Sequence, residues 1–423
     1  MSLPDADLPR REYLRGLVAA GGMAALSACV NTSGVDSESV PTGDPANRPA
    51  RQHAWNEVLS RDEAGNIAPP EHHVLVALDL TGTPDETARE QVETAFRSLE
   101  RAYAHGPDGL LFTVSYSPGY FERVGVASPI PEPEPLTSIE SDVELDTFAA
   151  VVHLTTNPPS VVLEAEEALL GEVTKPNGIE METDLTGVFA AADQRRTGFV
   201  GDGLPAQMAR EHDIDVPDEM PEEAPFFMGF RSGFNASQAP EDRVTIQDGP
   251  YAGGTTMHIE SLDLNLRQWF EQDDHFLRVA KMFSSGHANE ERVGEMAKKL
   301  GTATGASEVA AETTEDARAE GIVGHAQKNA RARDEDGTPP LLRRDFNTID
   351  GDRPGVHFLA HQRSIDEFVR TRRLMAGEDV AGEGGVGRRL NNGILQYIFV
   401  MRRGNFLTPP RELRALPTAE REA

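Results

Sequence analysis

The order of apolar runs along the chain is the feature that most restricts its fold. Residues 74–80 form a mostly apolar run that predicts a buried strand, and a helical pattern begins near Thr83. Further strands are predicted over residues 109–116 and 148–155, and a second helix over residues 160–170. The resulting order, strand–helix–strand–strand–helix, is typical of a ferredoxin-like α+β unit.

The first helix carries start and stop signals. Thr83 is expected to cap it, Pro84 fits the first helical position, and Glu86 would close a capping box. Gly106 is expected to end the helix because glycine tolerates the left-handed conformation that follows a last turn.

The same alternation returns in the second half of the chain. Strands are predicted over residues 255–262, 355–362 and 393–401, with a helix over residues 364–375. Asp263 is expected to cap another helix, and residues 302–320 have a helical or acidic composition. We therefore predict an α+β protein of two ferredoxin-like domains, with antiparallel sheets and packed helices. The predicted divisions are residues 71–220, 221–410 and a tail over residues 411–423.

The N-terminus is typical of an export signal. Arg10 and Arg11 form a twin-arginine pair, and the apolar residues 16–25 have the length of a signal core. The stretch ends at Cys29 in a sequence like a lipobox, and this is the only cysteine, so a disulfide within the chain is impossible. We interpret residues 1–28 as a cleaved signal. The expectation is an exported, extracytoplasmic lipoprotein, held at the membrane by a lipid anchor alone.

Residues 29–70 are predicted to form a flexible polar tether because they are rich in Ser, Pro, Gly and Asp. The whole chain has 70 acidic and 40 basic residues and a net charge of −30. Such a surface repels phosphate backbones, so nucleic acid is not an expected partner. An acidic, lysine-poor surface fits a high-salt environment, where screening weakens self-repulsion. An edge strand of either sheet could pair with a second copy, which leaves a homo-oligomer open.

No common motif for metalloproteases, zinc sites, nucleophilic serines or nucleotide phosphates occurs in the chain. His357 and His361 lie four residues apart on one predicted strand, and metal ligation by this pair is not favoured because no acidic or cysteine partner is evident. His325 lies in the segment GIVGHAQKNAR, and Arg343 and Arg344 lie in LLRR. In isolation these would be interpreted as a loop histidine and a solvated arginine pair.

Several segments, taken together and in order, carry a resemblance to a known family. They are GLLFTVSYSPGYFERVG, FAAVVHLTT, GFRSG, GTTMHIESLDLNLRQWF, the Gly-His segment, LLRR, GVHFLAHQRSIDEF and RRGNFLTPP. In this order the chain resembles the dye-decolorising (DyP-type) peroxidases, which are haem proteins built from two ferredoxin-like domains. The resemblance extends over about residues 72–410.

The resemblance implies roles for three residues. His325 would ligate the iron of haem b from the proximal side, and such a ligand would normally donate its other ring N–H to a carboxylate or a carbonyl. Arg343, eighteen residues further on, takes the place of the distal arginine and would stabilise negative charge as the peroxide bond breaks. Arg344 is the alternative, or could meet a haem propionate.

The resemblance also gives a role to the stretch PFFMGFRSGFN, residues 225–235. The family has a GxxDG motif over the distal face of the haem, and Gly229 and Gly233 match its glycines, which allow the backbone to approach the porphyrin. Ser232 stands where the family has its aspartate. A positioned acid–base group contributes about 10²–10⁴ in rate, so this replacement weakens the expectation of efficient turnover.

The resemblance implies a peroxidase-like enzyme that reduces hydrogen peroxide and oxidises an unknown electron donor. Two alternatives remain open. The first is a haem carrier or sensor on the same fold, which Ser232 favours. The second is a non-haem interaction lipoprotein, which the Asn329-Ala330-Arg331 sequence favours because the family has proline at its centre.

Overall fold

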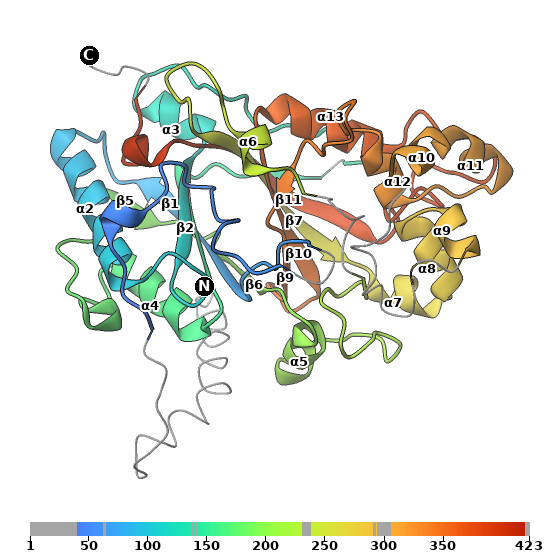
Figure 1. Ribbon diagram of the computed structural model, residues 1–423, viewed down its shortest axis with the longest axis horizontal. Helices are drawn as coiled ribbons and strands as arrows, with labels where there is room; N and C mark the ends of the chain where they lie inside the picture. The colour runs from blue at the N-terminus through green and yellow to red at the C-terminus, as the bar shows by residue number, and fades with distance from the viewer. Residues whose placement is uncertain are drawn as a thin grey trace, which may run out of the picture.

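The structure is a computed structural model that describes residues 40–61, 65–137, 139–140, 142–230, 238–290, 293 and 306–418. Figure 1 shows strands gathered in the middle of the molecule, with α2 and α4 to one side and α8 to α12 to the other. The signal segment, Cys29, Ser232 and Gly233 lie outside the described residues. Within those residues no helix is long and apolar enough to cross a membrane.

The first half of the chain alternates strands and helices. Its strands are β1 (His72–Leu80), β2 (Leu111–Tyr116), β3 (Glu144–Leu145), β4 (Ala150–Thr156), β5 (Phe189–Ala191) and β6 (Arg196–Phe199). Its helices are η2 (Pro45–Asn47), α2 (Glu86–Ala102), α3 (Pro118–Arg123), α4 (Pro159–Leu169), η3 (Pro176–Gly178) and α5 (Leu204–Glu211).

The second half repeats this plan with more helix. Its strands are β7 (Thr255–Leu264), β8 (Leu342–Arg343), β9 (Phe346–Thr348), β10 (Gly355–Gln362) and β11 (Ile398–Thr408). Its helices are α6 (Glu241–Val244), α7 (Leu266–Glu271), α8 (His275–Met282), α9 (Ser285–Asn289), α10 (Ala306–Ala311), α11 (Thr313–Ala319), α12 (His325–Ala330), α13 (Ile365–Ala376) and η5 (Arg411–Leu413).

The strand order confirms the predicted α+β class. In space the first half runs β2-β4-β1-β6, and the second half runs β9-β10-β7-β11, in each case with antiparallel pairing. Both orders are the ferredoxin-like arrangement. The halves join twice, where β6 pairs with β9 and where β2 pairs with β11. The described strands therefore close into a barrel, and the edges expected to be available to a second copy pair with each other.

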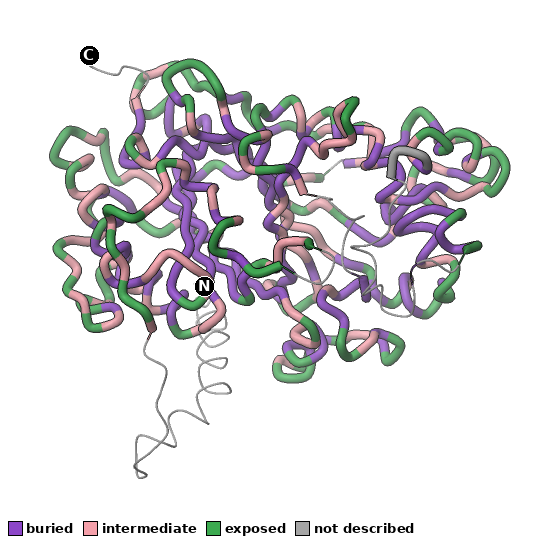
Figure 2. Tube along the Cα trace, viewed as in Figure 1, coloured by how far each residue is buried: buried purple, intermediate pink, exposed green. Residues whose placement is uncertain are grey.

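Two apolar clusters follow from the alternation of side chains along the strands. One contains Leu75, Val151, Met257 and Leu359, which come from β1, β4, β7 and β10, so it lies where the two halves face each other. The other joins the opposite strand faces to the helices that cover them, as at Phe96 of α2. Figure 2 shows buried residues concentrated along the central strands.

Several predicted boundaries need correction. Asp85 caps α2 in place of Thr83, because its carboxylate accepts a hydrogen bond from the N–H of Ala88. Similarly Asn265 caps α7 in place of Asp263, because β7 continues as far as Leu264. The last strand begins at Ile398 and not near residue 393.

The segment predicted as a tether packs closely on the barrel over part of its length. Trp55 is fully buried, its backbone N–H donates to Glu241 Oε1 at 2.6 Å, and its ring lies against Leu59 and Leu111. Gln52 Nε2 donates to the carbonyl oxygens of Val114 and Pro409. These partners are far away in sequence, so the composition of the segment did not reveal its burial.

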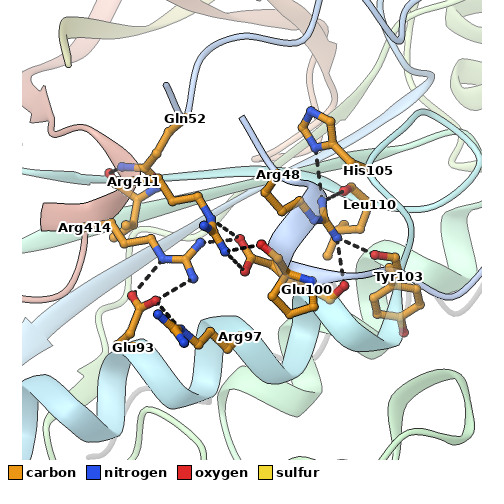
Figure 3. A network of polar contacts seen from close by, with 12 residues as sticks. Arg48, Gln52, Glu93, Arg97, Glu100, Tyr103, His105, Leu110, Arg411 and Arg414 are labelled. Carbon is orange, nitrogen blue, oxygen red and sulfur yellow. Dashed lines mark hydrogen bonds and ion pairs between the residues drawn. The ribbon is translucent and has the colours of Figure 1, made fainter. Parts of the chain in front are cut away.

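The C-terminal segment is also fixed, and not a free tail. Figure 3 shows Arg411 and Arg414 converging on Glu100 of α2, with distances of 2.5 Å from each to the carboxylate. Arg48 donates to the carbonyl oxygen of Glu100, so residues before the barrel join the same network. Burial alone would raise the pKa of Glu100, but the hydrogen bonds from Arg411 and Arg414 outweigh it and lower the pKa to about 2.

Removal of this central carboxylate should destabilise the fold. Glu100→Gln leaves the partly buried Arg411 and the buried Arg414 without the carboxylate that they share, and loss of one partner from a buried ion pair costs about 3–5 kcal/mol. Urea unfolding at fixed salt measures the change in free energy. Glu90→Gln, at an exposed position of the same helix, is the control and should change stability by less than about 0.5 kcal/mol. Equal stabilities of the two variants would contradict this account.

Candidate functional site

His325 is the first residue of α12, and its backbone position is tightly fixed. Gly324 passes so close to Phe283 that a Cβ atom at this position would lie 1.8 Å from the Phe283 carbonyl oxygen. Gly393 lies on the other side, where a Cβ would be 3.0 Å from the Cα of His325. Gln327 Oε1 accepts from the N–H of Gly324 at 2.9 Å and so closes the first turn of the helix. The backbone that carries the imidazole of His325 is therefore held rigidly.

The imidazole of His325 is uncharged near neutral pH and has an unpartnered nitrogen. The residue is half-buried, and its Nδ1 atom is buried with no hydrogen-bond partner in the described part of the chain. Burial, followed by the positive side chains of Lys328, Arg343 and Arg372, lowers the pKa of His325 to about 3. The imidazole is therefore neutral near pH 7, which is the form that binds metals. The carboxylate or carbonyl partner expected for the second ring nitrogen is not found among the described residues.

The charge of Arg343 acts on His325 and lowers the pKa of its imidazole. It ends β8, its N–H donates to Gln238 Oε1 at 2.7 Å, and its side chain is largely buried. Its Nη1 atom is 4.0 Å from the carboxylate of Asp345. The structure thus gives Arg343 a fixed backbone position and a carboxylate beside its guanidinium.

Arg344 does not join this group. Successive residues of an extended chain point to opposite sides, so Arg344 turns away from the side taken by Arg343. Its guanidinium lies 4.2 Å from the ring centre of Trp55, donates to the carbonyl oxygen of His53 and faces Glu241 at 3.5 Å. Its Nε atom is buried and has no hydrogen-bond partner among the described residues, and its contact with a haem propionate stays a prediction.

A cluster of buried histidines surrounds Arg344, and sequence reasoning missed it. His53, His73, His153 and His361 are each no more than 1 % exposed, and His73 Nδ1 lies 3.0 Å from His153 Nε2. Nδ1 of His53, Nδ1 of His153 and both ring nitrogens of His361 lack partners in the described chain. A signal was available, because three of these histidines lie two residues from inward-facing apolar positions of their strands.

His357 differs from the prediction in another way. Its Nε2 atom lies 3.0 Å from Asp350 and its Nδ1 atom 3.1 Å from Ser261, so an acidic partner is present after all. His361, four residues on, has no part in these contacts. Among the described residues no group of three or more His, Cys, Asp or Glu side chains is arranged to hold a metal ion.

The stretch that precedes Ser232 is held by Asn347 of β9. The Asn347 amide accepts from the N–H of Phe227 at 3.1 Å and donates to the carbonyl oxygens of Pro225 and Phe199. Gly229 then adopts a φ of +84°, which favours glycine, and the chain turns there. The proposed approach of Gly229 and Gly233 to a porphyrin stays a prediction.

Comparison with known proteins agrees with this fold. The chain belongs to a family of unknown function, DUF7405, whose sequence model matches residues 70–410. Among curated proteins no significant relative is found. Solved structures of dye-decolorising peroxidases share the fold, at sequence identities too low to transfer an activity.

Three of these structures illustrate the likeness. The dye-decolorizing protein from Vibrio cholerae has 14 % identity and a TM-score of 0.53, with 85 % of this chain and 98 % of that chain covered. A DyP-type peroxidase from Cellulomonas bogoriensis has 19 % identity and a TM-score of 0.55, with 83 % and 93 % covered. A variant of Rhodococcus jostii DypB in complex with heme has 13 % identity and a TM-score of 0.55, with 86 % and 98 % covered.

The buried histidines should make stability fall in mild acid. Burial lowers the pKa of His53 and of His73 to about 3, whereas a histidine in an unfolded chain titrates near pH 6.5. As the pH falls below 6.5 only the unfolded state takes up these protons, so each histidine lowers the free energy of unfolding by up to about 1.4 kcal/mol per pH unit.

Urea unfolding between pH 6.5 and 5 tests this linkage through the slope of stability against pH. His73→Gln should reduce the slope, because one buried imidazole no longer contributes, whatever its effect on absolute stability. The same slope in the variant and the wild-type protein would show that His73 is not neutral in the folded state.

Proposed function

We propose that this protein binds haem b through His325 and acts as a peroxidase-like oxidoreductase. The observation that carries the proposal is the neutral, half-buried imidazole of His325 within the electrostatic range of Arg343 and Arg372. An imidazole in this state suits an iron ligand, and cationic side chains around it suit an anionic macrocycle and a developing negative charge. The fold is shared with haem-containing proteins, which supports haem as the cofactor but does not by itself establish haem binding.

In the proposed reaction hydrogen peroxide accepts two electrons and two protons and becomes two molecules of water, while a donor of unknown identity is oxidised. The haem, when bound, would supply the redox chemistry. His325 would hold the iron from one side. Arg343 would stabilise the negative charge on the departing peroxide oxygen, because a guanidinium stays charged at any physiological pH.

A proton must also move between the two peroxide oxygens, and Ser232 is a poor base for this step. Asp345 offers a carboxylate at this side of the chain, 4.0 Å from Nη1 of Arg343. We propose that Asp345, aided by water, takes part of the role that an aspartate at position 232 would have.

The Arg343→Leu variant tests the reaction directly. Loss of one positioned group that stabilises developing charge lowers turnover by about 10²–10³-fold, so kcat/KM for peroxide should fall by this factor while haem content is unchanged. Arg353→Leu is the control, because Arg353 is mostly exposed and pairs with Asp263. Peroxide-dependent dye oxidation by haem-loaded protein is the measurement. Full activity in Arg343→Leu would rule out this role.

A haem carrier or sensor is the second candidate, and the serine at position 232 specifically favours it. In that case the wild-type protein would bind haem without appreciable turnover of peroxide. Ser232→Asp should then raise turnover, because it restores an acid–base group to the GxxDG position.

We further propose that the protein is exported through the twin-arginine route and anchored by a lipid on Cys29. The sequence around Arg10, Arg11 and Cys29 supports this proposal. Cys29→Ser should move the protein from the membrane fraction to the soluble extracytoplasmic fraction in cells of its source. Retention of this variant in the membrane would contradict lipid anchoring at Cys29.

A further inference from the structure

A pocket of about 270 Å³ opens between α13, the start of β11 and the residues Ile139, Glu140, Asp142 and Val143. This volume lies just below the range of about 300–1,000 Å³ that is usual for ligand sites, so it suits a small molecule or one end of a larger one. Its walls combine apolar side chains, among them Ile139, Leu395, Ile398 and Phe399, with the cations Arg372 and Arg389 and the carboxylates Glu140 and Asp142. No role described above uses this pocket.

Arg372 is the main polar feature of the pocket. The residue is only 4 % exposed, and its Nη2 atom donates to Glu140 Oε1 at 2.7 Å. Its Nε and Nη1 atoms are buried and have no hydrogen-bond partner among the described residues. Buried donors almost always find a partner, so two unused donors on a buried guanidinium indicate a missing acceptor.

Arg372 belongs to a buried network of two guanidiniums and two carboxylates, which is formally neutral. Glu140 is shared with Arg403, which it meets at 2.9 Å, so one carboxylate serves two guanidiniums. Arg403 also pairs with Glu260. Asp142 lines the pocket too, but it is exposed at the surface.

Arg389 supplies a second cation with an aromatic neighbour. Its guanidinium carbon lies 4.6 Å from the ring centre of Phe399, and its Nη2 donates to the carbonyl oxygen of Ile398 at 2.6 Å. Burial and then the charge of Arg372 lower the pKa of Arg389, which places the two guanidiniums within electrostatic range of each other. Phe399 and Met401 remain exposed beside them.

We propose that Arg372 and Arg389 form a binding site for a carboxylate carried on an apolar or aromatic body. Nε and Nη1 of Arg372 lie on different edges of the guanidinium, and each can donate one charge-assisted hydrogen bond to a carboxylate oxygen. The apolar walls and Phe399 suit the body of such a ligand. The pocket is too small for a macromolecule, and Asp142 disfavours an anion of higher charge.

The carboxylate could come from two sources. One is a propionate of the haem held by His325, since Arg372 is close enough for its charge to act on that imidazole. This source rests on the proposed function. The other is a separate aromatic acid, which needs no haem.

Binding of 4-methoxybenzoate to the folded protein, measured by calorimetry at fixed salt, tests the site itself. The uncharged 4-methoxybenzamide should bind at least about tenfold more weakly, because it cannot form the ionic contact. Arg372→Gln should weaken binding of the acid by a similar factor, and Arg370→Gln, at an exposed position of the same helix, should leave it unchanged. Arg372→Lys keeps the positive charge but lacks the several N–H donors of a guanidinium. It replaces Arg372→Gln in this test if Arg372→Gln does not fold.

Haem and haem dimethyl ester separate the two sources, because the ester has no free carboxylate. If a propionate occupies the site, the wild-type protein prefers haem over the ester, Arg372→Gln abolishes the preference, and 4-methoxybenzoate binds only the haem-free protein. If the site takes a separate acid, 4-methoxybenzoate binds both the haem-free and the haem-loaded protein, and Arg372→Gln leaves the preference unchanged.

The proposal is overturned if the acid and the amide bind equally in every variant and the preference for haem over its ester does not depend on Arg372. If no haem binds at all, the proposed function fails. Calorimetry of 4-methoxybenzoate binding to the haem-free protein then still shows whether the carboxylate site exists.

Discussion

The close backbone contact between β6 and β9 is the constraint on which the rest of the structure depends. Gly198 approaches Asn347 so closely that a Cβ atom at position 198 would lie 1.9 Å from the Asn347 carbonyl oxygen. This contact joins the two ferredoxin-like halves, and the Asn347 side chain then ties β6 to Pro225 and Phe227. Asn347 therefore takes part in one of the two junctions of the barrel and also holds the segment of Pro225 and Phe227. A side chain at Gly198 would disturb both at once.

The electrostatics of the candidate site contrast with those of the whole molecule. The chain has a net charge of −30, yet the charges of Arg343 on β8 and Arg372 on α13 both act on His325 and lower the pKa of its imidazole. Positive charge concentrated beside a neutral imidazole favours an anionic ligand, whether a haem propionate, another carboxylate or the oxygen released from peroxide. The same arrangement supports both the proposed enzyme and the proposed carboxylate site, which share Arg372 as a neighbour.

Local patterns predicted much of the fold, and long-range contacts explain the failures. The strand over residues 355–362 appears with the predicted bounds, since alternating and apolar residues record burial directly. The burial of Trp55 could not be predicted, because Glu241 and the barrel that receive it are distant in sequence. The roles that the resemblance gives to His325, Arg343 and Arg344 stay predictions. The packing of Arg344 against Trp55 could not be predicted, because it depends on the strand face and on a distant segment.

The most direct test of the account is the visible absorption spectrum of the folded protein with haem supplied in high salt, beside His325→Ala. The account predicts a Soret band in the wild-type protein that shifts or disappears in His325→Ala. His275→Ala, at an exposed position, should leave the band unchanged. A wild-type protein without a Soret band would contradict haem binding, and with it the enzyme and the carrier alike. An unaltered band in His325→Ala would show that haem is held elsewhere.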